Sequence, residues 1–110
     1  MGGSDLFTGT LDLLILGIVE QQPLHGYAIG KHIREASRGV VDLEEGALYP
    51  ALHRLRRKQL VTSAWRRTET GRRAKYYSIT PAGARRLAEE RDRWQAFSEA
   101  VRAVLGTSAG

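Results

Sequence analysis

The sequence predicts one mainly α-helical domain that carries a single small β-hairpin and ends in a long helix. Three observations support this fold class. Apolar residues recur with helical spacing over the first 59 positions, the period shortens to two between residues 61 and 79, and a helix start signal follows at Thr80-Pro81. The length of 110 residues suits one domain.

Two helices are predicted in the first part of the chain. The segment from Thr10 to Gln21 is apolar on most sides, which is typical of a helix that packs against several partners. Pro23 disfavours helix in the residue before it and ends this segment. A second helix is predicted from Gly26 to Ser37, with Gly39 at a position where a left-handed residue commonly follows a helix.

A third helix is predicted from Asp42 to about Gln59. Asp42 is expected to act as its N-cap, and Glu45 three residues later resembles the second half of a capping box. Pro50 lies inside this helix, so we expect a bend that the helix survives.

The hairpin and the last helix follow from a change of pattern. Alternation from Val61 to Arg67 and a β-forming stretch from Arg73 to Ile79 flank a turn that contains Gly71. Thr80 is expected to cap the last helix, with Pro81 at its first position, and this helix should reach about Leu105.

Charge is concentrated in one third of the chain. Residues 46–80 carry nine basic side chains and one acidic one, whereas residues 1–45 carry three and seven, and the net charge of the whole chain is +5. This asymmetry favours a polyanionic partner, with nucleic acid ahead of an anionic membrane. A solvated basic face without a partner is the alternative.

Several functional classes are excluded or disfavoured. The absence of cysteine excludes disulfide scaffolds, zinc–thiolate sites and cysteine nucleophiles. His25 and His32 lack a carboxylate–histidine cluster with ligand spacing, so no metal or cofactor is predicted. No nucleophile motif indicates an enzyme. The apolar run from Leu11 to Val19 is too short to span a membrane, and the chain is expected to be cytoplasmic.

The third helix has two different faces on a helical wheel. Leu48, Leu52 and Leu55 share a narrow arc that should pack inward. The outer arc and its borders carry cations and hydrogen-bonding groups: Gly46, Tyr49, Pro50, His53, Arg54, Arg56 and Arg57. Such a face suits the major groove of double-stranded DNA, where side chains contact phosphates and base edges.

The hairpin adds a second cationic element. Arg72, Arg73 and Lys75 lie at or just past its tip, where they can reach a flanking phosphate or a minor groove. Together, the order of elements and the placement of charge predict a winged helix-turn-helix DNA-binding domain over residues 1–80. Residues 81–110 are then a C-terminal dimerisation helix and tail.

Four segments closely resemble the motifs of PadR-type transcriptional regulators, in that family's order and spacing: Gly9–Leu16 (GTLDLLIL), Pro23–Tyr27 (PLHGY), Glu45–Leu55 (EGALYPALHRL) and Arg73–Gly83 (RAKYYSITPAG). The resemblance covers residues 6–105, and the short C-terminal part looks like that of the compact subfamily with one terminal helix.

This resemblance implies a homodimeric repressor that binds an inverted repeat. The family's third helix enters the major groove and its wing contacts the flanking backbone, roles that would fall on Tyr49, His53 and Arg57 and on the three wing cations. Gln59 departs from the glycine that the family usually has there, so it must turn the chain at a cost of about 1 kcal/mol.

The last helix carries an apolar stripe predicted to form the dimer interface: Leu87, Trp94, Phe97, Val101 and Val104. A domain of this size cannot easily cover such a stripe alone, so a partner helix is expected. Trp94 lies where ligand-sensing relatives place a tryptophan that stacks on flat drug-like molecules, which implies a small planar apolar ligand. Simple packing in the dimer core is the favoured alternative for Trp94.

Two other functions remain open on the sequence alone. One is a winged-helix module whose basic face binds an acidic protein, and the other is a nucleoid-type protein that binds DNA without sequence preference. A specific regulator should prefer its own site over random DNA by ~10³ or more.

Overall fold

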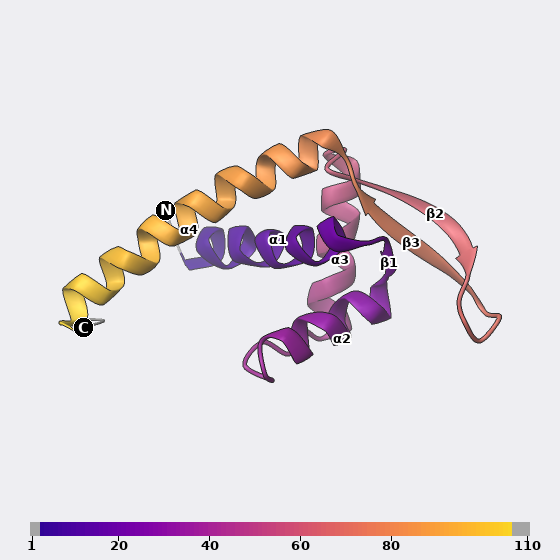
Figure 1. Ribbon diagram of the computed structural model, residues 1–110, viewed down its shortest axis with the longest axis horizontal. Coiled ribbons are helices and arrows are strands. Elements are labelled where there is room, and N and C mark those ends of the chain that lie inside the picture. Colours follow the sequence, from indigo (N-terminus) through magenta and orange to yellow (C-terminus); the bar gives the residue numbers. More distant parts are fainter. Residues whose placement is uncertain (1–2, 107–110) are drawn as a thin grey trace.

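The computed structural model describes residues 3–106 of the chain, and side chains from residue 9 onward. Figure 1 shows the order of its elements, which is α1 (Gly3–Gln21), β1 (Leu24–His25), α2 (Gly26–Ala36), α3 (Glu45–Arg57), β2 (Val61–Arg67), β3 (Arg73–Ile79) and α4 (Pro81–Leu105). This order confirms the predicted mainly helical fold with one hairpin. Residues 107–110, the end of the predicted C-terminal segment, lie outside the described residues.

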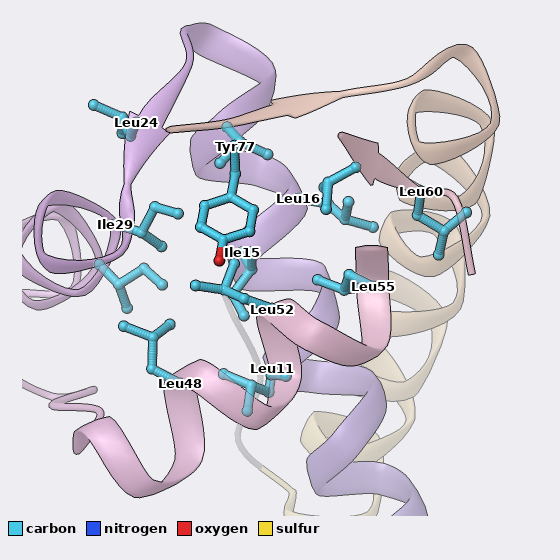
Figure 2. Packing of buried hydrophobic residues seen from close by; sticks show 14 of the residues in the cluster. Leu11, Ile15, Leu16, Leu24, Ile29, Leu48, Leu52, Leu55, Leu60 and Tyr77 are labelled. Atoms are coloured by element: carbon cyan, nitrogen blue, oxygen red, sulfur yellow. The ribbon is translucent and has the colours of Figure 1, made fainter. Parts of the chain in front are cut away.

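The hydrophobic core is built around α1, which contacts α2, α3, β3 and α4. Its buried residues Leu11, Ile15, Leu16 and Val19 span a continuous arc of about 140° at 100° per residue, a broad face that suits a helix with several partners. Figure 2 shows the ring of Tyr77 pointing from the sheet into this core, towards the helices. No helix among residues 3–106 is long and apolar enough to cross a membrane.

The sheet has three antiparallel strands in the order β1-β3-β2. The predicted hairpin is β2 and β3, in which Trp65 lies opposite Lys75. The third strand was not predicted: Leu24 and His25 pair with Tyr77 and Tyr76. A two-residue strand is too short to show alternation, so no sequence period could identify it.

The start of α3 differs from the prediction. The helix begins at Glu45 with Glu44 as its N-cap, and the side chain of Glu44 makes no capping hydrogen bond. Asp42 instead lies with its carboxylate 3.8 Å from the guanidinium of Arg34. The reason is that Val41 and Leu43 pack against the core, and the hydroxyl of Ser37 accepts a hydrogen bond from the Val41 backbone (2.9 Å), which keeps this segment outside the helix.

The start of α4 is attached to the turn between α3 and β2. The backbone N–H of Gly83 donates to the Thr80 hydroxyl (2.9 Å), which donates to the carbonyl of Gln59 (2.8 Å). Gln59 has the expected left-handed conformation, with φ of 61°. Gly83 is required by space, because a Cβ there would overlap the carbonyl oxygen of Leu60 and lie 2.8 Å from Cγ1 of Ile79.

Helix α4 packs on the body over its first turns and then extends beyond it (Figure 1). Leu87 is 1% exposed and belongs to the core of its own chain, which corrects its predicted place in the dimer stripe. Trp94, Phe97, Val101 and Val104, by contrast, are exposed along the rest of the helix. The stripe that one chain leaves uncovered therefore starts at Trp94.

Candidate nucleic-acid interface

Helix α3 divides into a buried face and an exposed face, as its sequence predicts. Leu48, Leu52 and Leu55 are buried in the core. The exposed side chains and positions on the other side are Gly46, Tyr49, Pro50, His53, Arg56 and Arg57. Burial of the leucines fixes the helix on the body and leaves an outward surface with three hydrogen-bonding side chains, two of them arginines, in its last two turns.

Arg54 does not belong to that outward surface, which corrects its predicted place beside it. Its Nη2 donates to Oδ1 of Asp12 on α1 at 2.6 Å, and the side chain is 27% exposed. Asp12 is itself only 4% exposed. A carboxylate buried this deeply is costly without a cationic partner, so Arg54 lies against α1 and ties α3 to it. Its Nε is buried and has no hydrogen-bond partner among the described residues.

Tyr49 is positioned by a glycine on the neighbouring helix. A Cβ added at Gly26 would lie 2.6 Å from Cε1 of Tyr49, so only glycine lets the ring lie against the first turn of α2. Tyr49 nevertheless keeps 43% of its surface exposed. The sequence indicated Gly26 only as a helix start, and its partner could not be found without the fold.

The Tyr77 side chain of β3 is buried in the core. Burial raises the pKa of its phenol, while the positive charge of Arg56 opposes that rise and Tyr49 adds slightly to it. Figure 2 shows the Tyr77 ring pointing towards Ile15 of α1 and Leu52 of α3.

The wing carries its cations on a hairpin that extends away from the body (Figure 1). Arg72 and Arg73 are exposed and Lys75 is half-buried. Arg67 donates to the carbonyl of Gly71 (2.9 Å), which ties the turn to β2. The sequence analysis did not single out Trp65 as part of this surface. The Cζ of Arg73 lies 5.2 Å and the Nζ of Lys75 lies 5.4 Å from the centroid of its ring.

The start of the exposed stripe of α4 borders a cleft, and a second hollow lies on the other side of α1. The rings of Trp94 and Phe97 lie 6.0 Å apart between their centroids and face a cleft of ≈ 170 Å³ between α1 and α4, with Leu13 on its opposite wall. The carboxylate of Glu90, 3.3 Å from the Arg93 guanidinium, forms its polar part. A wider groove of ≈ 390 Å³ lies along the apolar side chains of α1, towards α2 and Arg91.

Comparisons with known proteins agree with this architecture. The model of the PadR-like family of transcriptional regulators matches residues 15–89. The transcriptional regulator Rv3488 of Mycobacterium tuberculosis is 41% identical over 73 residues, 66% of this chain and 64% of that protein. The transcriptional regulator YqjI of Escherichia coli is 33% identical over 95 residues, 86% of this chain but 44% of that protein.

Solved structures show the same fold over nearly the whole chain. A transcriptional regulator from Clostridium thermocellum superposes with a TM-score of 0.80 at 28% identity, covering 94% of this chain and 97% of that one. A PadR family regulator from Clostridium difficile gives 0.76 at 33% identity, covering 86% and 97%. The chain belongs to the PadR family and is a transcriptional regulator with a DNA-binding winged helix, not an enzyme.

Proposed function

We propose that this regulator binds an inverted-repeat DNA site as a homodimer and represses transcription there, in the cytoplasm and on the nucleoid. The observation that carries the proposal is the outward face of α3, which is cationic and exposed while the opposite face is buried. A helix held in this way presents its side chains to a major groove without disturbing the core.

Tyr49, His53 and Arg57 are the proposed base-reading residues, with Gly46 and Pro50 at the end of the helix that approaches DNA. Gly46 supports this placement. A glycine inside a helix is about 1 kcal/mol less favourable than alanine, and beyond the adjoining residues and the nearby backbone of α3 no described atom lies within 4 Å of the Cβ that an alanine would add. Packing within the chain therefore gives no reason for a glycine at this position. A close approach of DNA to the backbone would, because a side chain there would stand between them.

Arg72, Arg73 and Lys75 are the proposed phosphate contacts of the wing. They are placed on a hairpin whose residues 61–79 contain a single acidic side chain, Glu69. A phosphate contact positions a protein on DNA without reading the sequence. Substitution of a wing cation should therefore weaken binding to all DNA sequences, whereas substitution of a base-reading residue of α3 should change sequence preference.

A second copy of the chain is the proposed cover for the apolar stripe of α4. Val104 is 84% exposed, and Trp94, Phe97 and Val101 extend the same surface towards the body. Exposed apolar side chains in one contiguous row favour a helix partner. A two-fold dimer through α4 would also supply the two reading helices that an inverted repeat requires.

The cleft beside Trp94 supports a separable proposal, a small planar apolar ligand that relieves repression. Such a ligand changes DNA binding only if it binds one spacing of the two reading helices more tightly than the other. A Trp65→Phe variant makes Trp94 the only tryptophan, so its emission tests the site. Quenching by a panel of flat aromatic compounds is expected. Buried emission that none of them quenches would leave Trp94 as dimer packing alone.

The main test compares Gly46→Ala with Gly17→Ala, two helical glycines with open space around the missing Cβ. Both should raise the free energy of unfolding by about 0.5–1 kcal/mol. Only Gly46→Ala should weaken binding to a duplex selected from a random-sequence library, by about tenfold. Equal affinities for the two variants would contradict the placement of α3 in the groove.

The same duplex separates the proposed function from its two alternatives. A preference of ~10³ or more over random DNA is expected for a specific regulator. A ratio near one would indicate a nucleoid-type binder, and no binding at moderate salt would indicate a protein-interaction module. Arg57→Gln should relax preference at particular bases, whereas Arg72→Gln should weaken all sequences alike and lower the salt slope by about one.

A further inference from the structure

Trp65 is an unusual residue for the surface on which it lies. It is 59% exposed on β2, outside the buried cluster that forms the core. Leaving a large aromatic ring in water forgoes the stabilisation that burial would give. Packing in the core therefore does not explain a tryptophan here, but the charged side chains beside it do.

Two cations of the wing lie against the Trp65 ring. Lys75 is its direct partner across the strands, with Nζ 5.4 Å from the ring centroid, and Arg73 lies two residues before Lys75 on β3, with Cζ at 5.2 Å. Both distances are within the range of a cation–π interaction. Two like charges on neighbouring positions of one strand face repel each other, and the negative face of the indole offsets that repulsion.

Trp65, Arg73 and Lys75 lie on the face of the sheet that is turned towards the core. Side chains two apart on a strand share a face, so Arg73, Lys75 and Tyr77 point the same way, and Tyr77 is buried under α3. The cation pair is therefore presented on the side of the hairpin on which α3 lies. Arg66, which stacks on Tyr76 with Cζ 4.5 Å from the ring centroid, lies on the opposite face.

We propose that Trp65 is a positioning residue of the DNA interface, whose ring holds Arg73 and Lys75 together as one phosphate-binding pair. This rests on the proposed DNA-binding function and adds a residue to it. Free arginine and lysine side chains lose much rotamer freedom when they bind a phosphate. Cations already held against a ring lose less, so the pair binds DNA more tightly than two independent side chains would.

The test is a mutant cycle on DNA affinity. Trp65→Leu keeps apolar bulk but removes the aromatic face, and it should weaken binding about fivefold on selected and random duplexes alike. Trp65→Phe keeps a smaller aromatic face and should restore most of the affinity. Thermal melting of each variant shows whether the hairpin stays folded, and rescue by phenylalanine separates the ring's role from a loss of structure.

The background of the cycle decides the mechanism. In a variant with Arg73→Gln and Lys75→Gln, Trp65→Leu should change affinity by less than about twofold, because the ring has nothing left to hold. In an Arg66→Gln background, the matched control on the opposite face, the full fivefold loss should remain. A loss that persists without Arg73 and Lys75, or no loss in the parent chain, would overturn the proposal.

Failure of the inference can be told apart from failure of the proposed function. If the parent chain binds the selected duplex specifically but the cycle shows no coupling, only the role of Trp65 is wrong. If the parent chain binds no DNA at low or moderate salt, both the proposed function and the role of Trp65 are wrong.

Discussion

The two halves of α4 belong to one continuous helix and yet have opposite environments. The first half begins at the Thr80 cap, packs Gly83 against the Leu60 backbone and buries Leu87. The second half carries Trp94, Phe97, Val101 and Val104, all of which are exposed.

The difference shows what an apolar stripe does and does not specify. Leu87 and Trp94 are seven residues apart on the same stripe, but their exposed fractions are 1% and 43%. Helical periodicity identifies the face that needs a cover. What covers it depends on how closely the rest of the chain packs beneath the helix, and here the packing loosens from the core around Leu87 to an open cleft beside Trp94.

The largest expected effect is in the first half. Leu87→Ala should lower the free energy of unfolding by about 2–4 kcal/mol, since it leaves a cavity in a packed core. Chemical denaturation at two protein concentrations should give the same loss. Val104→Ala is the matched control, and at a protein concentration low enough to dissociate the proposed dimer it should lower the free energy of unfolding by less than about 0.5 kcal/mol. Similar losses for both variants would remove the distinction between the halves.

A charge on the second half tests whether a partner covers it. Val101→Asp should weaken the dimer about 30-fold, or about 2 kcal/mol, because a carboxylate would be buried without a partner. Sedimentation of both chains at micromolar concentration gives the measurement. A parent chain that sediments as a monomer would show that the exposed stripe has another role.

The cap of the first half should have a smaller effect. Thr80→Ala removes the hydrogen bond that Gly83 donates and the one that reaches Gln59, and the expected loss is about 1–2 kcal/mol. Thr80→Ser keeps both bonds and should recover most of the stability. If serine were no better than alanine in thermal melting, the hydroxyl would not be what fixes the helix start.

The end of the second half should have the smallest effect. Gly106 caps α4 with φ of 73°, a conformation that costs an alanine about 1 kcal/mol. The last turn is exposed, so Gly106→Ala should fray it locally and change global stability by less than about 0.5 kcal/mol. Amide exchange of the last turn should accelerate while the exchange of Leu87 stays unchanged.

The sequence predicts those features that are determined locally. The helix order, the hairpin and the Thr80 cap all follow from neighbouring residues, and the structure agrees with them. The left-handed turn at Gln59 follows from the resemblance to the family, which usually has glycine there, and the structure agrees with it too. The short strand β1 and the late start of α3 are different, because tertiary contacts create them. Leu24 becomes a strand residue only when β3 is beside it.

The candidate site divides in the same way. The wheel separates the two faces of α3 correctly, since burial on a helix follows its period. It could not reveal that Arg54 turns towards Asp12, 42 positions away, or that Gly26 makes room for Tyr49. The sequence analysis also placed Arg73 and Lys75 on the hairpin without linking them to Trp65. The pairing of β2 with β3 brings both cations onto its ring.

A helix held at one end is also a lever. The span from Gly83, which packs on the Leu60 backbone, to Leu105 is about 33 Å at 1.5 Å per residue, so a rotation of about 10° at Gly83 moves the far end by about 6 Å. Thr80 and Gly83, at this held end, contact the Gln59–Leu60 turn that directly follows α3. A small rotation at this contact, directly after α3, therefore corresponds to a much larger displacement near Val104.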